Sequence, residues 1–178
     1  MIRAAVMKTI LFLCTGNYYR SRFAEIFFNH HAEQRGVPWR ASSRGLALNP
    51  LNPGPISRYT VERLANHGIP VDGNRFPLDV TEQDFDAAFH VVAVKEAEHR
   101  PMIRSRFPTI LDRVEFWQVH DVDCAGPDVA MPHLESEVMG LMERLAGEAV
   151  EETRRATTAY SLSCLVAGDH PCVPNDLA

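Results

Sequence analysis

The most constraining feature of the chain is a short apolar run that leads directly into a loop of small residues. Lys8 to Leu13 reads KTILFL, and Cys14-Thr15-Gly16-Asn17 follows it. Bulky apolar residues bounded by a polar start and by Gly-Asn are typical of a strand buried on both faces. From Ser21 to Arg35 apolar residues recur at helical spacing, and Gly36 stands where a helix C-cap is expected. The sequence therefore predicts a strand, a tight loop and a helix, in that order.

The same alternation continues along the chain. Further strands are predicted at 39–43, 89–94 and 114–119, and helices at 56–67, from 81, at 96–107 and at 132–145. Strands that alternate with helices form a parallel sheet covered on both faces, with ligands at the carboxyl ends of the strands. We therefore expect an α/β fold with a single doubly wound, four-stranded parallel sheet and helices on both faces.

The length of the chain agrees with one domain, since its 178 residues fall within the usual size of about 100–200 residues. From about Gly147 the chain turns polar, and it loses its periodicity through 161–178. We predict a main domain at 1–146 and a C-terminal extension at 147–178 that is partly helical or loose.

Charge and hydropathy exclude several kinds of partner. A net charge of −5 and a pI of about 5.9 provide no basic footprint for nucleic acid or anionic lipid. No apolar run reaches the roughly 18 residues that a membrane span needs. Four cysteines are too sparse for a disulfide scaffold, which favours a reducing compartment. We expect a cytoplasmic monomer that binds neither nucleic acid nor a membrane.

The loop between the first strand and the first helix carries the chemistry. It reads CTGNYYRS at 14–21. Such a loop points successive N–H groups inward and adds the positive end of the helix dipole, so it binds an anion. Gly16 and Asn17 tolerate the left-handed backbone angles that a tight loop requires. The predicted phosphate-binding residues are Thr15, Gly16, Asn17, Tyr18, Tyr19 and Ser21.

Cys14 and Arg20 stand near the two ends of this loop. The Arg20 guanidinium is suited to grip two phosphate oxygens with a fork of N–H bonds. The helix dipole, the loop amides and Arg20 all favour a Cys14 thiolate, and the Ser21 hydroxyl can donate to its sulfur. A thiolate below a phosphoryl group is aligned for in-line attack, which gives a phosphocysteine. This chemistry requires no metal and no cofactor.

These residues resemble the active-site loop of the low-molecular-weight protein tyrosine phosphatases, which reads C-x-G-N-x-C-R-S followed by x-x-A-E. Residues 22–25, RFAE, supply the continuation; 41–45 resemble the family's S-A-G segment and 64–69 its end-of-helix pattern. The similarity covers roughly residues 7–146. It implies the fold predicted above and a metal-free phosphatase that acts on a phosphorylated protein or a small aryl phosphate.

The resemblance also implies a general acid, because an alkoxide or phenoxide leaves poorly unless it is protonated. The family uses the Asp of an Asp-Pro pair after the last strand. Here that strand runs into VHDVDC at 119–124, where no Pro follows either carboxylate. Asp121 is the preferred catalytic acid because it comes first after the apolar run, Asp123 is the second choice, and Asp128 ranks third.

Two further positions depart from the family pattern. Tyr19 replaces the cysteine that many members carry within the loop. Cys14 then has no adjacent resolving thiol, so peroxide is expected to produce a sulfenic acid. Tyr18 and Leu48 are predicted to line the substrate pocket, where the family has hydrophobic or aromatic residues. Since Leu48 is not aromatic, an aryl ring is expected to be held weakly.

The remaining polar clusters are interpreted as structural. A charge run, KEAEHR at 95–100, follows the third predicted strand and is typical of a solvated helix start, although it lies at the active-site edge. The histidines have no spacing typical of metal ligands, so no metal site is predicted.

The leading function is hydrolysis of phosphomonoesters, either protein phosphotyrosine or small aryl phosphates, through a phosphocysteine. Two alternatives stay open. An arsenate reductase needs further cysteines to accept the oxidising equivalent, and Cys124, beside the proposed acid, is the one such neighbour. A phosphate- or phosphopeptide-binding module with weak turnover is the other alternative, motivated by the missing Asp-Pro pair.

Overall fold

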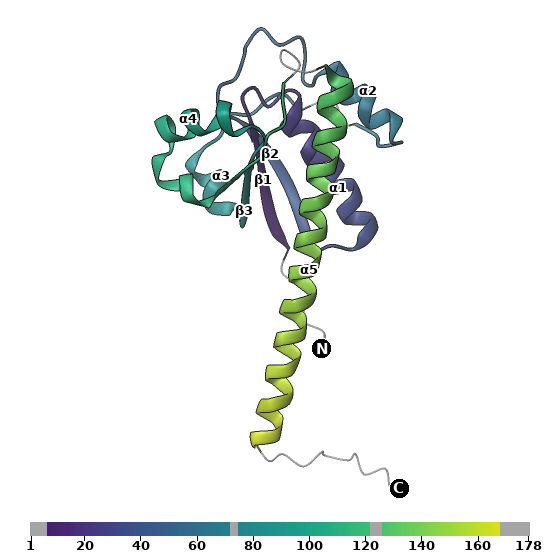
Figure 1. Ribbon diagram of the computed structural model, residues 1–178, viewed down its shortest axis with the longest axis vertical. Coiled ribbons are helices and arrows are strands. Elements are labelled where there is room, and N and C mark those ends of the chain that lie inside the picture. The colour runs from purple at the N-terminus through teal and green to yellow at the C-terminus, as the bar shows by residue number, and fades with distance from the viewer. Residues whose placement is uncertain (1–6, 72–74, 122–125, 168–178) are drawn as a thin grey trace, which may run out of the picture. The chain divides into compact units, whose positions relative to one another are not determined.

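The computed structural model describes residues 7–71, 75–121 and 126–167. In chain order they form β1 (Lys8–Cys14), α1 (Arg20–Arg35), β2 (Trp39–Gly45), α2 (Arg58–Asn66), α3 (Glu82–Ala87), β3 (His90–Ala93), α4 (Glu96–Arg106), the 3-10 helix η1 (Pro108–Arg113), β4 (Val114–Phe116) and α5 (Pro127–Ala167). Figure 1 shows these elements along the chain. The predicted alternation of strands and helices is confirmed.

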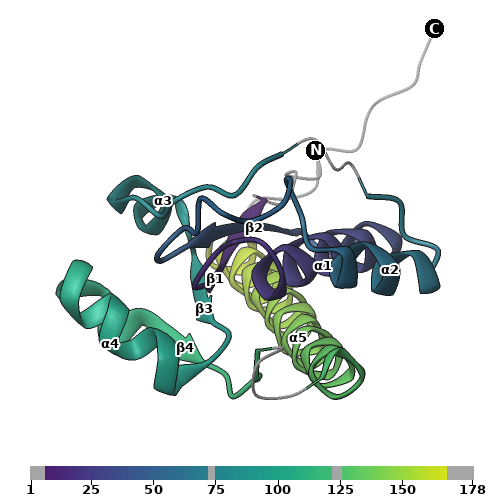
Figure 2. The same cartoon turned by 90° about the horizontal axis from the view of Figure 1, so that it is seen from above.

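The four strands form one parallel sheet in the order β2-β1-β3-β4. Figure 2 shows α1 and the first part of α5 on one face of this sheet, and α3 and α4 on the other. Parallel neighbours need a crossover connection, and the helices supply it. The predicted fold class, a doubly wound four-stranded parallel sheet with helices on both faces, is therefore confirmed.

β1 lies at the centre of the core. Because successive side chains of a strand point to opposite faces, one strand can pack against helices on both sides. Leu11 and Leu13 belong to the cluster that contains Ile103 of α4. Phe12 instead makes an edge contact with Phe28 of α1, with 6.2 Å between ring centroids. Burial on both faces is what an unbroken apolar run predicts.

The bounds that differ most from the predictions are those of β4 and of the last helix. β4 ends at Phe116 instead of residue 119, although the Val119 N–H still bonds to the carbonyl of Val94 beyond the sheet ladder. The last helix begins at Pro127 rather than at 132 and continues to Ala167. Pro127 takes the first helical position, where proline is favoured because its missing N–H has no partner there.

The chain divides into two compact units, Met1–Met142 and Glu143–Ala178. The division into a catalytic domain at 1–146 and an extension at 147–178 stays a prediction. α5 is 41 residues long, yet no helix in the described ranges combines the length and apolar character needed to cross a membrane.

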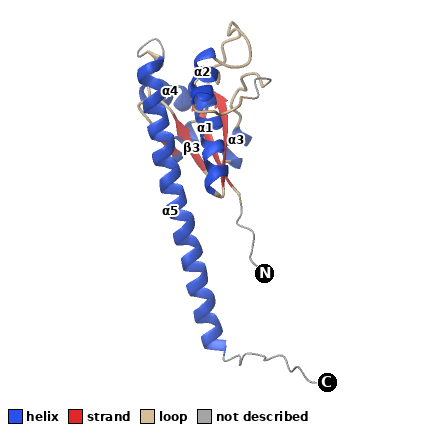
Figure 3. Cartoon of the chain, turned by 90° about the vertical axis from the view of Figure 1, so that its right-hand side faces the viewer, coloured by secondary structure: helices blue, strands red, loops and turns tan. Residues whose placement is uncertain are grey.

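The strand order determines where a ligand can bind. In an open sheet of this order the chain leaves β1 toward one side of the sheet and β3 toward the other. The segments that follow these two strands, 15–19 and 94–95, therefore diverge at the carboxyl edge of the sheet. Figure 3 shows loops gathered at this end of the strands. Ligands of such folds bind in the crevice between the diverging segments.

Candidate active site

The loop at 15–19 is fixed by segments that come later in the chain. The carbonyls of Cys14 and Thr15 accept the N–H groups of Leu46 and Ala47 at 2.9 and 2.8 Å. β2 passes very close to the loop at Gly45, where an added Cβ would stand only 2.9 Å from the Thr15 carbonyl oxygen. Glycine is therefore required where β2 meets the loop.

Asn17 forms the centre of the loop. It has a left-handed backbone with φ of 48° and is completely buried. Its Nδ2 donates to the hydroxyls of Ser21 at 3.0 Å and Ser43 at 2.8 Å. Its Oδ1 accepts the Leu78 N–H at 3.0 Å and an Arg75 N–H at 3.4 Å. Both ends of the side-chain amide are thus used to hold the loop in a conformation that few residue types tolerate.

Cys14 ends β1 at the base of the loop and is 3% exposed. Its Sγ lies 2.9 Å from the Ser21 Oγ. The Ser21 oxygen already accepts an N–H from Asn17, so its own proton is available to the sulfur. The arrangement provides a hydrogen-bond donor for a Cys14 thiolate, as the sequence predicts for Ser21.

Arg20 begins α1, and its side chain is only 2% exposed. One terminal nitrogen, NH1, donates to Glu98 at 3.0 Å and to the Val119 carbonyl at 3.3 Å. The other, NH2, donates to Glu98 at 3.0 Å and to Asp121 at 2.5 Å. Burial by itself lowers the pKa of Arg20, but the Glu98 hydrogen bond and the charges of Cys14 and Asp121 raise it above its ordinary value.

The acid candidates are placed unequally. The Asp121 carboxylate contacts Arg20 and is therefore brought to the loop that contains Cys14. Asp123 and Cys124 lie outside the described residues. Asp128 is exposed in the first turn of α5.

The aromatic residues of the loop point to different surroundings. Tyr18 is half-buried, and its hydroxyl donates to the Pro53 carbonyl at 3.0 Å. Tyr19 is buried, with its ring 6.1 Å from that of Tyr59 on α2. Within the described part of the chain the Tyr19 hydroxyl has no hydrogen-bond partner. Burial and the nearby Asp121 raise the pKa of Tyr19 to about 12.

Leu48, the other predicted pocket residue, is 37% exposed and lies against Gly45 where β2 meets the loop. Leu48 therefore lies beside the loop that contains the half-buried Tyr18.

Glu98 and His99 are site residues that the sequence interpretation missed. The run at 95–100 is not simply a solvated helix start, because His99 is completely buried and the Glu98 side chain is only 29% exposed. Burial raises the pKa of Glu98, but hydrogen bonds from His99, Arg20 and Thr15 outweigh it and hold that pKa well below its usual range. The pKa of His99 is lowered, mainly by burial.

A second set of residues that the sequence interpretation missed, Ser43, Glu25 and Arg75, forms hydrogen bonds around the Asn17 side chain. The Ser43 hydroxyl donates to Glu25 at 2.5 Å, and Arg75 donates to the same carboxylate oxygen at 2.5 Å. Ser43 and Glu25 lie in two of the segments that carried the family resemblance, and their types could have indicated a buried polar pair. Arg75 follows no periodic pattern, so no sequence signal indicated it.

Comparison with known proteins identifies the family. Residues 9–153 match the family model described as low molecular weight phosphotyrosine protein phosphatase. A protein-arginine-phosphatase of Bacillus subtilis is 33% identical over 105 residues, which cover 59% of this chain and 67% of that protein. The low molecular weight protein-tyrosine-phosphatase YfkJ of the same organism is 30% identical over 125 residues, covering 65% and 79%.

A solved structure agrees with these matches. The crystal structure of a low molecular weight protein tyrosine phosphatase from T. tengcongensis superimposes with a TM-score of 0.65 at 27% identity, covering 79% of this chain and 99% of that one. The chain belongs to the low-molecular-weight protein tyrosine phosphatase family. It is a cysteine-dependent phosphatase that acts on phosphorylated substrates, so the resemblance and the enzyme class predicted from the sequence are confirmed.

Proposed function

We propose that the protein hydrolyses aryl phosphate monoesters, above all protein phosphotyrosine, with Cys14 as nucleophile, Arg20 as phosphate clamp and Asp121 as general acid. One observation carries the assignment of roles. The Cys14 sulfur lies 2.9 Å from a hydroxyl donor in a loop whose arginine also contacts Asp121 at 2.5 Å. Nucleophile, anion-binding group and proton donor are therefore linked through one loop.

In the first step the Cys14 thiolate attacks phosphorus in line with the leaving oxygen. The S–P bond forms while the P–O bond to the aryl group breaks, and Asp121 transfers its proton to the departing phenoxide. Arg20 and the loop N–H groups stabilise the charge on the three equatorial oxygens. The Ser21 hydroxyl stabilises the thiolate before attack and again when sulfur leaves.

In the second step water attacks the phosphocysteine. Asp121, now ionised, accepts a proton from that water as the P–O bond forms and the S–P bond breaks. The products are inorganic phosphate and the Cys14 thiolate. Asp121 is 32% exposed, so a water molecule can reach its carboxylate.

The test is hydrolysis of p-nitrophenyl phosphate and of phenyl phosphate at mildly acidic pH, with a chelator present. Cys14→Ser is expected to remove turnover, because a hydroxyl in this position is a far weaker nucleophile than a thiolate. Asp121→Ala is expected to lower kcat on phenyl phosphate by about 10²–10⁴-fold, and less on the activated p-nitrophenyl ester.

Two matched variants, Asp123→Ala and Asp128→Ala, remove the other candidate acids, of which Asp128 is exposed. If Asp123→Ala causes the larger loss on phenyl phosphate, the acid role moves from Asp121 to Asp123. If the wild type binds phosphate but shows no turnover, the hydrolase assignment fails, and arsenate reduction or phosphate sensing remains. Arsenite release that depends on added thiol and is lost in Cys124→Ser would indicate the reductase.

Phosphoarginine is a second candidate substrate. The observation that favours it is the 33% identity to a protein named as a protein-arginine-phosphatase. Comparing kcat/KM for a phosphotyrosine peptide and a phosphoarginine peptide of the same sequence decides between the two substrates.

We further propose that the enzyme works as a cytoplasmic monomer on phosphorylated proteins. Its acidic net charge of −5 supports a partner other than nucleic acid or anionic lipid. Light scattering on the purified full chain tests the monomer, with a concentration-dependent mass as the contrary result.

A further inference from the structure

The Arg20 guanidinium has two edges that can bind a carboxylate or phosphate with a pair of N–H groups. The end-on edge consists of NH1 and NH2, and the side-on edge of Nε and NH2. Glu98 takes the end-on edge, with its Oε2 3.0 Å from NH1 and its Oε1 3.0 Å from NH2. Asp121 accepts from NH2, the nitrogen common to both edges, at 2.5 Å.

Glu98 is itself held by the loop and by the first turn of α4. The Thr15 hydroxyl donates to its Oε1. The His99 Nδ1 accepts the Lys95 N–H at 3.1 Å, so neutral His99 carries its proton on Nε2. That Nε2 lies 3.3 Å from the Thr15 hydroxyl oxygen. A chain of hydrogen bonds thus runs from the Lys95 N–H, just before α4, through His99 and Thr15 to Glu98.

We propose that Glu98 is a positioning residue for Arg20: it occupies the end-on edge of the guanidinium and so keeps the side-on edge directed at the phosphoryl group. This rests on the proposed function of the loop. Without Glu98 the end-on edge also becomes available to Asp121, which already accepts from NH2 and can then hold both terminal nitrogens of the guanidinium against phosphate. Glu98 therefore sets the direction of the clamp.

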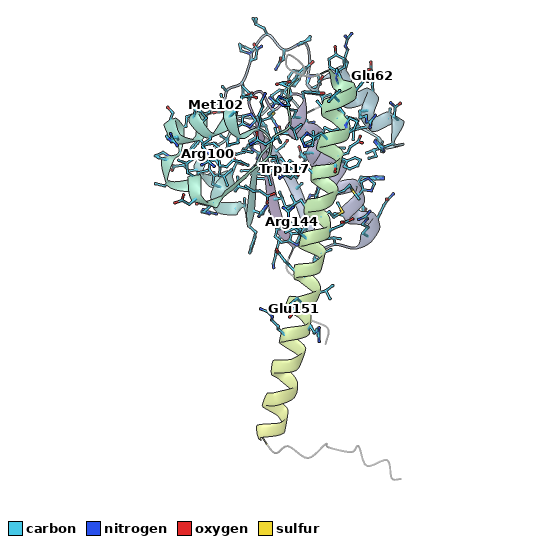
Figure 4. All side chains as sticks on the ribbon, in the orientation of Figure 1. Glu62, Arg100, Met102, Trp117, Arg144 and Glu151 are labelled. Atoms are coloured by element: carbon cyan, nitrogen blue, oxygen red, sulfur yellow. The ribbon has the colours of Figure 1, made fainter. Side chains whose placement is uncertain are left out.

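The placement of Glu98 follows from the strand order. The loop follows β1, and α4 follows β3, the neighbouring strand in the sheet. Segments after adjacent parallel strands meet at the carboxyl edge of the sheet, where the crevice lies. Arg100, labelled in Figure 4, marks the helix whose first turn carries both Glu96 and Glu98.

Glu96 offers a matched control. It belongs to the same first turn of α4 but bonds to Arg100 at 2.8 Å and to Gln118 at 3.0 Å, away from the loop. Glu96→Gln and Glu98→Gln therefore make the same change in charge at nearly the same point of one helix. Only the second removes a partner of Arg20.

The experiment measures kcat/KM on p-nitrophenyl phosphate for the wild type, Glu98→Gln, Arg20→Lys and the double variant, with Glu96→Gln as control. Glu98→Gln is expected to lower kcat/KM about tenfold or more, and Glu96→Gln less than about twofold. In the Arg20→Lys background, where no fork exists to be positioned, Glu98→Gln is expected to change kcat/KM by less than about twofold. Losses that multiply independently in the double variant, or equal losses in the two Gln variants, overturn the proposal.

The binding of inorganic phosphate, measured by calorimetry, tests the same inference without turnover. Removing a negative charge beside the loop by itself strengthens the binding of an anion. A higher phosphate Kd in Glu98→Gln therefore reports lost orientation, whereas an unchanged or lower Kd contradicts the proposal. Phosphate binding can be measured even if the wild type shows no turnover. A failure of the proposed function is therefore distinguished from a failure of the role proposed for Glu98.

Thr15→Val keeps the test usable if Glu98→Gln fails to fold. It removes the hydroxyl that donates to Glu98 while preserving side-chain shape. A loss of several-fold in kcat/KM, again absent in the Arg20→Lys background, is expected. A loss of the same size in both backgrounds overturns the proposal.

Discussion

Two arginine–glutamate pairs in the molecule use the same chemistry in different surroundings. Arg20 donates two hydrogen bonds to Glu98, both at 3.0 Å. Arg63 of α2 donates two to Glu135 of α5, at 2.6 and 2.8 Å. The Arg20 side chain is 2% exposed and that of Arg63 is 31% exposed. Both pairs are therefore bidentate, but Arg20 uses its end-on edge (NH1 and NH2) and Arg63 its side-on edge (Nε and NH2), and only the Arg20 guanidinium is shielded from water.

A histidine accompanies each pair, and again burial separates them. His99 is completely buried and contacts the Thr15 hydroxyl through its Nε2. His67 is 35% exposed and lies 2.8 Å from Glu135. The comparison teaches that an arginine fork with its glutamate does not by itself indicate a site. A buried guanidinium beside a loop that begins with a cysteine does, because its charge acts at short range in a poorly screened environment.

Replacing each arginine by lysine should separate the two pairs most strongly. Arg20→Lys is expected to lower kcat/KM on p-nitrophenyl phosphate by about 10²–10³-fold, because an ammonium lacks the fork that grips two phosphate oxygens. Arg63→Lys is expected to leave kcat/KM within about twofold. Steady-state kinetics on both variants provides the measurement, and losses of similar size would remove the distinction.

Arg20 of the buried pair follows the loop at 15–19, whose backbone conformation should also affect the stability of the protein. Asn17→Ala is expected to destabilise the protein by about 2–4 kcal/mol, because alanine disfavours a left-handed backbone and Ser21 and Ser43 lose a buried partner. Asn17→Gly should be about 1 kcal/mol more stable than Asn17→Ala, since glycine tolerates the left-handed backbone although it too lacks the side-chain hydrogen bonds. Urea unfolding of both variants measures this, and equal stabilities would mean that the backbone carries no strain.

Acid should weaken the two pairs in the same direction. Burial raises the pKa of both Glu98 and Glu135, but their hydrogen bonds hold each below the ordinary 4.5. The unfolded chain then binds protons more readily than the folded one, so stability is lost as the pH falls below about 4.5. Glu98→Gln should therefore cost the protein less stability in acid than at neutral pH, measured as the difference in free energy of unfolding from the wild type. The same difference for Glu135→Gln should also shrink in acid, but by a smaller amount. A difference that grows in acid would reverse the sign assigned here.

The surface pair should have the smallest effect. Glu135→Gln is expected to lower the free energy of unfolding by about 0.5–1 kcal/mol, because water reaches the Arg63 side chain, which is 31% exposed, and screens the pair. The same variant should keep the kcat/KM of the wild type. Thermal unfolding and a kinetic assay on one preparation check both statements, and a clear loss of activity would extend the site to α2.

Local sequence carried most of the fold and the centre of the site. The run at 8–13, the loop at 14–21 and the helix after it are adjacent in sequence, so periodicity and turn chemistry suffice to predict them. The sheet order then follows from general rules for parallel strands. The start of α5 at Pro127 was predictable from the preference of proline for the first helical position, but the internal Pro132 was taken for the start.

The residues that hold the site in place could not be predicted from local sequence patterns. Glu98 meets Arg20 across 78 residues of sequence, and KEAEHR has the composition of any solvated helix start. One rule could have indicated it, since the first turn of the helix after β3 lies at the same sheet edge as the loop after β1. Arg75 reaches Asn17 and Glu25 from an irregular segment, where periodicity provides no information.

The ties that hold the loop also make it a reporter of refolding. The Cys14 and Tyr18 carbonyls are bonded to Leu46 and Ser57, and the Asn17 side chain to Leu78. These partners lie about 30 to 60 residues away, so forming them requires closure of long chain segments, a step slower than local helix formation. During refolding from denaturant, helical circular dichroism should therefore return before enzymatic activity. The interval between the two signals measures how late the chain assembles the surroundings of its nucleophile.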